Sequence, residues 1–196
     1  MNKENIKTIA HPAFVLFIIV FVSVALLVFF DGITREKIEL INAQNSEKAR
    51  IEVLPEAKGF EKIEFEEKDI VKEIYEGHSD NEIAGYCVSV VPKGYGGDIT
   101  MTVGIDKDLK VTGVKITNSS ETAGLGKNAE KEDFTNQYIG LKKGINVVKG
   151  TANKEKNEID ALSGATITSK AVSEGVDRAI EEVEKILKEE AAKWKN

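Results

Sequence analysis

The segment DITMTVGIDKDLKVTGVKIT, residues 98–117, has the pattern of two β-strands joined by a tight turn. Residues 98–105 are rich in β-branched side chains, and residues 109–117 alternate apolar and polar positions. Residues 106–108, Asp-Lys-Asp, have the composition of a hairpin turn. A third strand-like run, EIAGYCVSVV at residues 82–91, precedes the hairpin. We therefore predict an antiparallel β-meander.

Helical patterns flank these strands. Residues 31–53 are polar with periodic apolar positions, which predicts a helical stalk leading to Pro55. A short helix or turn is expected at residues 132–138, and a short strand within residues 141–152. After Ser169 the apolar positions follow helical spacing at Val172, Val176, Ala179, Ile180, Val183, Ile186 and Leu187. The predicted class is α+β, an antiparallel sheet with packed helices.

The small number of cysteines and histidines excludes several kinds of redox and metal site. The chain has one cysteine, Cys87, and two histidines, which excludes an intrachain disulfide, a four-cysteine iron–sulfur site and haem attachment through paired cysteines. A zinc site built from Cys and His is disfavoured for the same reason, so redox chemistry would need an organic cofactor. The whole chain has a net charge of −6. Two lysines and one glutamate give residues 1–30 a charge of +1, so residues 31–196 carry a net charge of −7. An acidic domain of this kind disfavours nucleic acid as a partner.

The run AFVLFIIVFVSVALLVFF, residues 13–30, has Ser23 as its only polar side chain. At about 1.5 Å per residue, a helix of this length spans roughly the hydrocarbon core of a bilayer. A cleaved signal peptide is the alternative, because small residues at 23–25 resemble a cleavage site. Cleavage there would leave LLVFF exposed, so we favour an uncleaved anchor.

The charges that flank this run do not decide its orientation. Lys3 and Lys7 precede it, and Arg35 and Lys37 follow it, so the positive-inside rule gives a tie. The predicted organisation is an N-terminal segment (1–12), a transmembrane helix (13–30), a helical stalk (31–55) and a folded domain (56–196).

Two glycine-rich loops follow predicted strands. Residues 93–97 read KGYGG and residues 120–126 read SETAGLG, so each presents one large apolar side chain, Tyr95 or Leu125, among small residues. Glycines that simply make turns explain both loops. Glycines also let the backbone approach a flat ligand, and an aromatic or leucine side chain can cover the face of a ring. Both interpretations stay open from these residues alone.

The stretch IDALSGATITSKAV, residues 159–172, gathers small and hydroxyl residues before the last predicted helix. Helix capping explains such a cluster. A helix start with small residues also suits a phosphate, because its N–H groups are unpaired and carry partial positive charge. The stretch is neither a P-loop nor a nucleophile elbow, since both of those motifs are absent. A hydroxyl here can instead hold a phosphate covalently.

These segments together resemble the FMN-binding domain of the RnfG and NqrC subunits of respiratory complexes. The resemblance includes the N-terminal anchor, VLPEA at 53–57, GYGG at 94–97, VGID at 103–106, ETAGLG at 121–126 and DALSGAT at 160–166. The last pattern is the family's flavinylation motif. One departure is Ala123, where the family loop often has proline. The chain lacks extra insertions associated with NqrC and is more similar to RnfG.

The resemblance implies a set of cofactor-binding residues. FMN would be joined through its phosphate to Thr166 by a separate flavin transferase, and the phosphate would lie against N–H groups near Thr168 and Ser169. Asp160 would be recognised by the transferase, or would serve as a turn or cap residue. Tyr95 and Leu125 would lie near the ring faces. The remaining members are Glu121 and Thr122 at the ring edge, together with Gly124, Ser163, Gly164 and Ala165. No catalytic or metal-binding residue is predicted.

The resemblance further implies a function and a location. The chain would be a single-pass inner-membrane protein with a cytoplasmic N-terminus and an extracytoplasmic FMN domain. It would relay electrons, among other membrane subunits, in an Rnf-type ferredoxin:NAD oxidoreductase that pumps Na⁺ or H⁺, rather than act as an enzyme alone. The alternatives are an anchored FMN-binding assembly or sensory module without redox turnover, a stand-alone flavin reductase, and an NqrC-like subunit of a quinone reductase.

Overall fold

The computed structural model describes residues 3–65, 69–80 and 82–193. The chain divides into two compact units, Met1–Gln44 and Asn45–Asn196. Helix α1 (Lys3–Val53) begins in the first unit and ends in the second. The side chains of residues 1–10 lie outside the described part of the structure, and this includes Lys3 and Lys7.

The first unit is the N-terminal part of α1. Its segment His11–Arg35 contains 25 residues and is long and apolar enough to cross a membrane by length and composition. The Ser23 hydroxyl donates a hydrogen bond to the Ile19 carbonyl oxygen at 2.8 Å. The single polar side chain of the apolar run therefore has a partner inside the helix, which lowers the cost of placing it in hydrocarbon.

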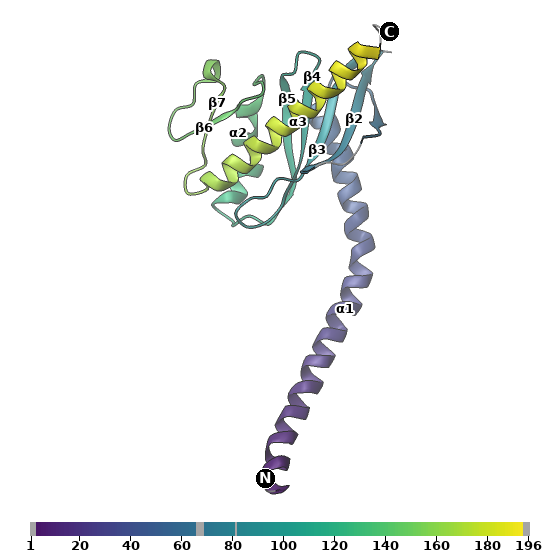
Figure 1. The fold of residues 1–196 in the computed structure, drawn as a ribbon, viewed down its shortest axis with the longest axis vertical. Helices are drawn as coiled ribbons and strands as arrows, with labels where there is room; N and C mark the ends of the chain where they lie inside the picture. The colour runs from purple at the N-terminus through teal and green to yellow at the C-terminus, as the bar shows by residue number, and fades with distance from the viewer. Residues whose placement is uncertain (1–2, 66–68, 81, 194–196) are drawn as a thin grey trace. The chain divides into compact units, whose positions relative to one another are not determined.

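The second unit contains a five-stranded antiparallel sheet in the order β1-β2-β3-β4-β5 (Figure 1). Its strands are β1 (Gly59–Ile63), β2 (Val71–Ser79), β3 (Glu82–Val90), β4 (Ile99–Asp106) and β5 (Val111–Ser119). The predicted meander of the last three strands and the α+β class are confirmed.

The hairpin turn is longer than predicted. The Asp106 carboxylate accepts the backbone N–H groups of Asp108 and Lys110, at 2.8 and 2.9 Å. Leu109, expected as the first residue of the next strand, has a φ of +60° and belongs to the turn. Strand β5 therefore begins at Val111, two residues later than predicted.

Strands β1 and β2 were not expected from the sequence. The buried positions of β2 are Val71, Ile74 and Gly77, so they recur every third residue rather than every second. The register of β2 against β3 shifts between Val71 and Glu73 and again between Gly77 and His78. These bulges break the alternation from which a strand is predicted.

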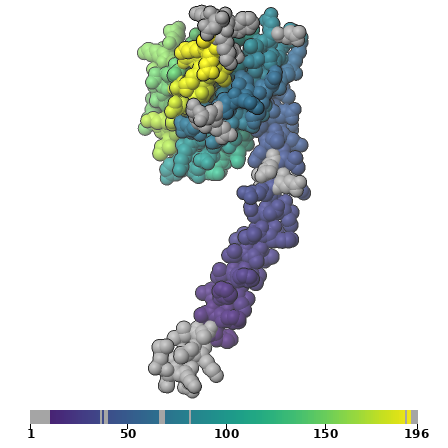
Figure 2. Space-filling view, turned by 45° about the vertical axis from the view of Figure 1, so that its right-hand side comes forward, coloured from purple at the N-terminus to yellow at the C-terminus, as the bar shows by residue number. Residues whose placement is uncertain are grey.

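The two faces of the sheet are covered by different helices. Helix α3 (Thr166–Lys193) lies across one face, and Figure 2 shows its yellow surface directly against the blue and teal strands. The core there includes Tyr86 and Val88 of β3 and Val176 of α3. Cys87, between them in β3, faces the other side, where it packs with Val53 at the end of α1. This division follows from the alternation of side chains along a strand.

The end of α1 is held against the backbone of the sheet. The Thr112 hydroxyl donates to the Val53 carbonyl oxygen at 2.5 Å. A Cβ atom at Gly104 would clash with that same carbonyl oxygen, and one at Gly113 would lie 2.9 Å from the Val53 Cα. Residues 45–53, assigned from the sequence to the stalk, thus pack into the folded unit.

The connection from β5 to α3 carries short elements. It contains η1 (Gly126–Glu130), α2 (Glu132–Thr135), η2 (Asn136–Tyr138), β6 (Asn146–Val148), η3 (Lys154–Lys156) and β7 (Glu158–Asp160). The helix or turn expected at 132–138 and the strand expected within 141–152 are confirmed. Strand β7 was not expected, and it pairs in parallel with β6.

We expect Gly104→Ala to lower the free energy of unfolding by about 1–3 kcal/mol, because the added methyl group must displace the backbone of Val53. Gly59→Ala is the matched control, since no atom of the described residues lies within 4 Å of a Cβ atom at that position. Urea unfolding of the full chain in detergent, followed by circular dichroism, measures both. Equal stability of the two variants would show that close contact between α1 and β4 is not required.

We expect the Cys87 thiol to resist alkylation in the folded protein. The side chain is fully buried, and burial raises its pKa to about 12, against a smaller opposite effect of the Arg50 charge. The reactive thiolate is therefore scarce at about pH 8. Iodoacetamide labelling followed by mass spectrometry should modify Cys87 only after denaturation. Rapid labelling of the native chain would contradict the tight packing of α1 on this face.

Candidate functional site

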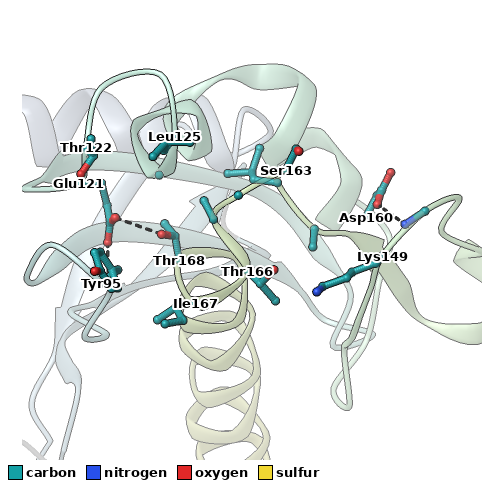
Figure 3. A pocket seen from close by; sticks show the side chains of 16 residues that line it. Tyr95, Glu121, Thr122, Leu125, Lys149, Asp160, Ser163, Thr166, Ile167 and Thr168 are labelled. Carbon is teal, nitrogen blue, oxygen red and sulfur yellow. Dashed lines mark hydrogen bonds between the residues drawn. The ribbon is translucent and has the colours of Figure 1, made fainter.

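A cavity of about 850 Å³ lies where three loops meet the start of α3 (Figure 3). Its walls come from Tyr95, from the turn Lys149–Gly150, from residues 160–168, and from Glu121, Thr122, Leu125 and Gly126. Pockets for cofactors typically measure about 300–1,000 Å³. The cavity is thus of cofactor size, and it brings together the three stretches that the sequence singled out.

Glu121 joins two of these walls to the helix. Its Oε1 accepts the backbone N–H groups of Tyr95 and Gly96, at 2.8 and 3.2 Å. Its Oε2 accepts the hydroxyl of Thr168 at 3.0 Å, and this bond is drawn in Figure 3. The side chain is buried, so its charge needs such partners to be tolerated.

Two glycines leave the space that the Glu121 carboxylate occupies. A Cβ atom at Gly94 would clash with Oε1, and one at Gly126 would clash with Oε2. The glycines of the 93–97 and 120–126 loops therefore do more than form turns, because they let the two loops close around one carboxylate. Glu121, expected at a ring edge, lines the cavity, and both its oxygens accept hydrogen bonds within the protein.

The hydroxyl cluster before α3 does not cap the helix in the expected way. The helix begins at Thr166, three residues earlier than predicted. The Ser169 hydroxyl is buried, accepts the Leu162 N–H at 3.0 Å and donates to the Ala165 carbonyl oxygen. The Ser169 N–H is also bonded to Ala165, so neither group is available to a phosphate.

The first turn of α3 keeps free donors instead. The backbone N–H groups of Thr166, Ile167 and Thr168 have no hydrogen-bond partner among the described residues. Such groups, together with the helix dipole, attract an anion. The N–H donors suited to a phosphate thus lie at 166–168 rather than at Thr168 and Ser169.

Three threonine and serine hydroxyl groups that line the cavity remain without a hydrogen bond among the described residues. They belong to Thr122, Ser163 and Thr166. The Thr168 hydroxyl is instead buried and donates to Glu121. Thr166 alone of the three lies within the first turn of α3, so its hydroxyl is nearest in sequence to the free N–H donors.

Apolar side chains stand at another part of the cavity wall. Tyr95, Leu125 and Ile167 are 74%, 45% and 56% exposed, although each is large and apolar. Exposed apolar groups that line one cavity are typical of a site for a ligand with an apolar face. The sequence indicated Tyr95 and Leu125, whereas Ile167 was not predicted.

Ten predicted residues line the cavity, namely Tyr95, Glu121, Thr122, Leu125, Asp160, Ser163, Gly164, Ala165, Thr166 and Thr168. Gly124 and Ser169 do not line it. The residues that were not predicted are Gly126, Lys149, Gly150, Ala161, Leu162 and Ile167. Four of these lie inside or beside a predicted motif, but no sequence signal marked Lys149 or Gly150.

We expect Glu121→Ala to lower the free energy of unfolding by about 2–3 kcal/mol, because it leaves three donors without an acceptor. Glu121→Gln should retain most of that stability, since its amide oxygen can accept the loop N–H groups and the Thr168 hydroxyl can accept from its NH₂. Urea unfolding compares the two variants. If Glu121→Ala were as stable as the wild type, the carboxylate would not be holding the loops.

The sequence pattern of the FMN-binding domain family matches residues 94–181, a range that contains the whole cavity wall. The fold is similar to two solved structures. One is the NqrC-type chain of the Na⁺-translocating NADH-quinone reductase of Parabacteroides distasonis, with a TM-score of 0.56 and 22% identity over 73% of this chain and 92% of that one. The other is NqrC of Shewanella oneidensis, with a TM-score of 0.51 and 22% identity over 63% and 65%.

Relatives of higher identity extend over nearly the whole chain. The G subunit of the Na⁺-translocating ferredoxin:NAD⁺ oxidoreductase complex of Acetobacterium woodii is 36% identical over 95% of this chain and 99% of its own. The G subunit of an ion-translocating oxidoreductase complex from Methanosarcina acetivorans is 31% identical over 93% and 96%. The chain therefore belongs to the RnfG family, the G subunits of ion-translocating ferredoxin:NAD⁺ oxidoreductase complexes, and carries that family's FMN-binding domain.

Proposed function

We propose that this chain is a membrane-anchored electron-transfer subunit that carries FMN on Thr166 through a phosphoester bond. The observation that carries the proposal is a free threonine hydroxyl in the first turn of α3, inside a cofactor-sized cavity of an FMN-binding domain. The cofactor itself supplies the electron chemistry, by accepting and releasing electrons at its ring. The protein binds it, orients it and limits its contact with water.

The residues present fit both ends of FMN. The phosphate would meet the free N–H groups at 166–168, which can offset its negative charge. The isoalloxazine ring would meet Tyr95, Leu125 and Ile167, which would cover its apolar faces. Glu121 would keep the loop that bears Tyr95 close to the helix that bears Thr166.

Attachment requires a donor and an enzyme. In the proposed reaction the Thr166 oxygen attacks the FMN-side phosphorus of FAD, the pyrophosphate bond breaks, and AMP leaves as the proton of the hydroxyl is released. A threonine hydroxyl is a weak nucleophile, so a separate flavin transferase and its metal would activate it. The reaction adds one FMN to the chain and changes no oxidation state.

The proposed location combines the apolar helix with the orientation that the family resemblance implies. The helix segment His11–Arg35 would cross the inner membrane once, with the N-terminus in the cytoplasm and the flavin domain outside it. A covalent link would keep the cofactor in place where lost FMN is not easily replaced. The partners would be the other membrane subunits of an Rnf-type complex that pumps Na⁺ or H⁺, and the chain would relay electrons among them.

The whole-chain relatives favour this assignment over an NqrC-like subunit, since the likeness to NqrC rests on 22% identity and concerns the fold. An FMN-binding module without redox turnover would share the anchor and the cavity. Reduction and reoxidation of the bound flavin by the neighbouring subunits of the purified complex would separate the two functions.

We expect Thr166→Ala to abolish covalent flavin, because it removes the one hydroxyl in the first turn of α3 that has no hydrogen bond among the described residues. The full chain is co-expressed with a flavin transferase, separated on a denaturing gel and viewed under ultraviolet light. Intact mass spectrometry should show one FMN per wild-type chain and none in the variant. Thr166→Ser should retain part of the label, since it keeps a hydroxyl at the same position.

Ser163→Ala and Thr122→Ala are the matched controls, because their hydroxyls also line the cavity and have no partner among the described residues. Both should keep the fluorescence of the wild type. Loss of the label in Ser163→Ala with retention in Thr166→Ala would move the attachment to Ser163. A wild-type chain without fluorescence under these conditions would overturn covalent attachment altogether.

A further inference from the structure

We infer that Lys149 binds the phosphate of the flavin on Thr166 and thereby fixes which way the flavin lies in the cavity. This inference rests on the proposed function. Lys149 follows β6, and no sequence motif marked it. In Figure 3 its amine points from its own turn toward the start of α3, where Thr166 lies.

The turn that presents Lys149 is fixed by Asp160. The Gly150 N–H donates to Asp160 Oδ1 at 3.0 Å, and the Ala161 N–H donates to the Val148 carbonyl oxygen at 2.8 Å. Gly150 has a φ of +115°, a conformation that other residues rarely adopt. The backbone on both sides of Lys149 is therefore held, while its side chain is left to reach into the cavity.

Asp160 therefore holds the turn that presents Lys149, a role that the sequence motif alone did not reveal. Its backbone is also held, because its N–H donates to Gln137 Oε1 at 2.7 Å. The Asp160 carboxylate binds the backbone of the turn that contains Lys149, so Asp160 positions Lys149 and need not contact the flavin itself. The structure agrees with the interpretation of Asp160 as a turn residue, with the addition that the turn carries a cation.

The other charges that line the cavity make Lys149 the natural partner of a phosphate. The ionisable side chains in the wall are Glu121, Asp160, Lys149 and the phenol of Tyr95. The two carboxylates would repel a phosphate, and Lys149 is the only cation among the described wall residues. A phosphodiester between FMN and threonine carries one negative charge, which one ammonium group can match.

Lys149 is not held by a carboxylate of the described residues, whereas several lysines elsewhere on the domain are. Lys127 pairs with Glu130 at 2.8 Å, and Lys143 lies 3.7 Å from Glu184. The Lys149 amine has no ion pair or hydrogen bond among the described residues. It is a free cation in a cavity whose other charges are negative.

A direction for the flavin follows. Lys149 and Tyr95 lie on opposite sides of Thr166 in Figure 3. With its phosphate drawn toward Lys149, the flavin would extend its ring toward Tyr95, Leu125 and Ile167, where the apolar wall is. Without Lys149 the phosphodiester bond still tethers the flavin, but nothing on this side sets its direction.

The test uses the full chain loaded with FMN and the phosphorus resonance of its single phosphodiester. In the wild type we expect this resonance to shift with added salt, because salt screens the ion pair. Lys149→Gln should move the resonance and remove most of that salt dependence, and Lys149→Arg should retain both. Lys142→Gln is the matched control, since Lys142 is exposed but lies outside the cavity wall, and it should behave as the wild type.

The outcomes separate this inference from the proposed function. If the wild type carries no flavin, the proposed function fails and the inference with it. If the wild type is loaded and Lys149→Gln has the same resonance and salt dependence, the inference fails while the proposed function stands. A third outcome is that Lys149→Gln folds, as judged by its melting curve, but carries no FMN, while Lys149→Arg carries FMN. A positive charge at position 149 would then be required for attachment, which supports the inference. Loss of loading in both folded variants would overturn it in favour of recognition of Lys149 by the transferase.

Discussion

The buried carboxylate of Glu121 is the constraint on which the cavity depends. A buried charge is tolerated only where donors surround it, and the donors come from the Tyr95 loop and from Thr168 in α3. Gly94 and Gly126 leave the space for it. Because the donors lie far apart in the sequence, satisfying one charge brings separate segments together and fixes the width of the cavity between them.

The cavity is also tied to the core through α3. The same helix that offers free N–H groups in its first turn buries Val172, Val176 and Ile180 against the sheet. The start of the helix therefore cannot move without disturbing the packing of its later turns. On the opposite face the end of α1 lies against the glycines of β4 and β5. The sheet is thus held from both sides, and the loops at its edge are the part left to bind a ligand.

The fold was predictable where local patterns carry the information. The meander of β3, β4 and β5 follows from β-branched alternation, and the apolar stripe of α3 follows from helical spacing. Strands β1 and β2 were missed because bulges shift the pleat of β2. The start of α3 was placed three residues late because its hydroxyls suggested capping, whereas Ser169 bonds Leu162 and Ala165 within the fold.

The sequence by itself determined three features: an apolar run long enough to cross a membrane, the α+β class and the motifs around Thr166. Each of these depends on residues that are close together in the chain. Only the tertiary structure decided that Glu121 faces inward to hold the loops, and that Lys149 reaches the same cavity as Thr166. The parallel pairing of β6 with β7 and the bond from Gly150 to Asp160 bring Lys149 there. The physical reason is that these contacts join residues distant along the chain, and such distances close only when the whole domain has folded.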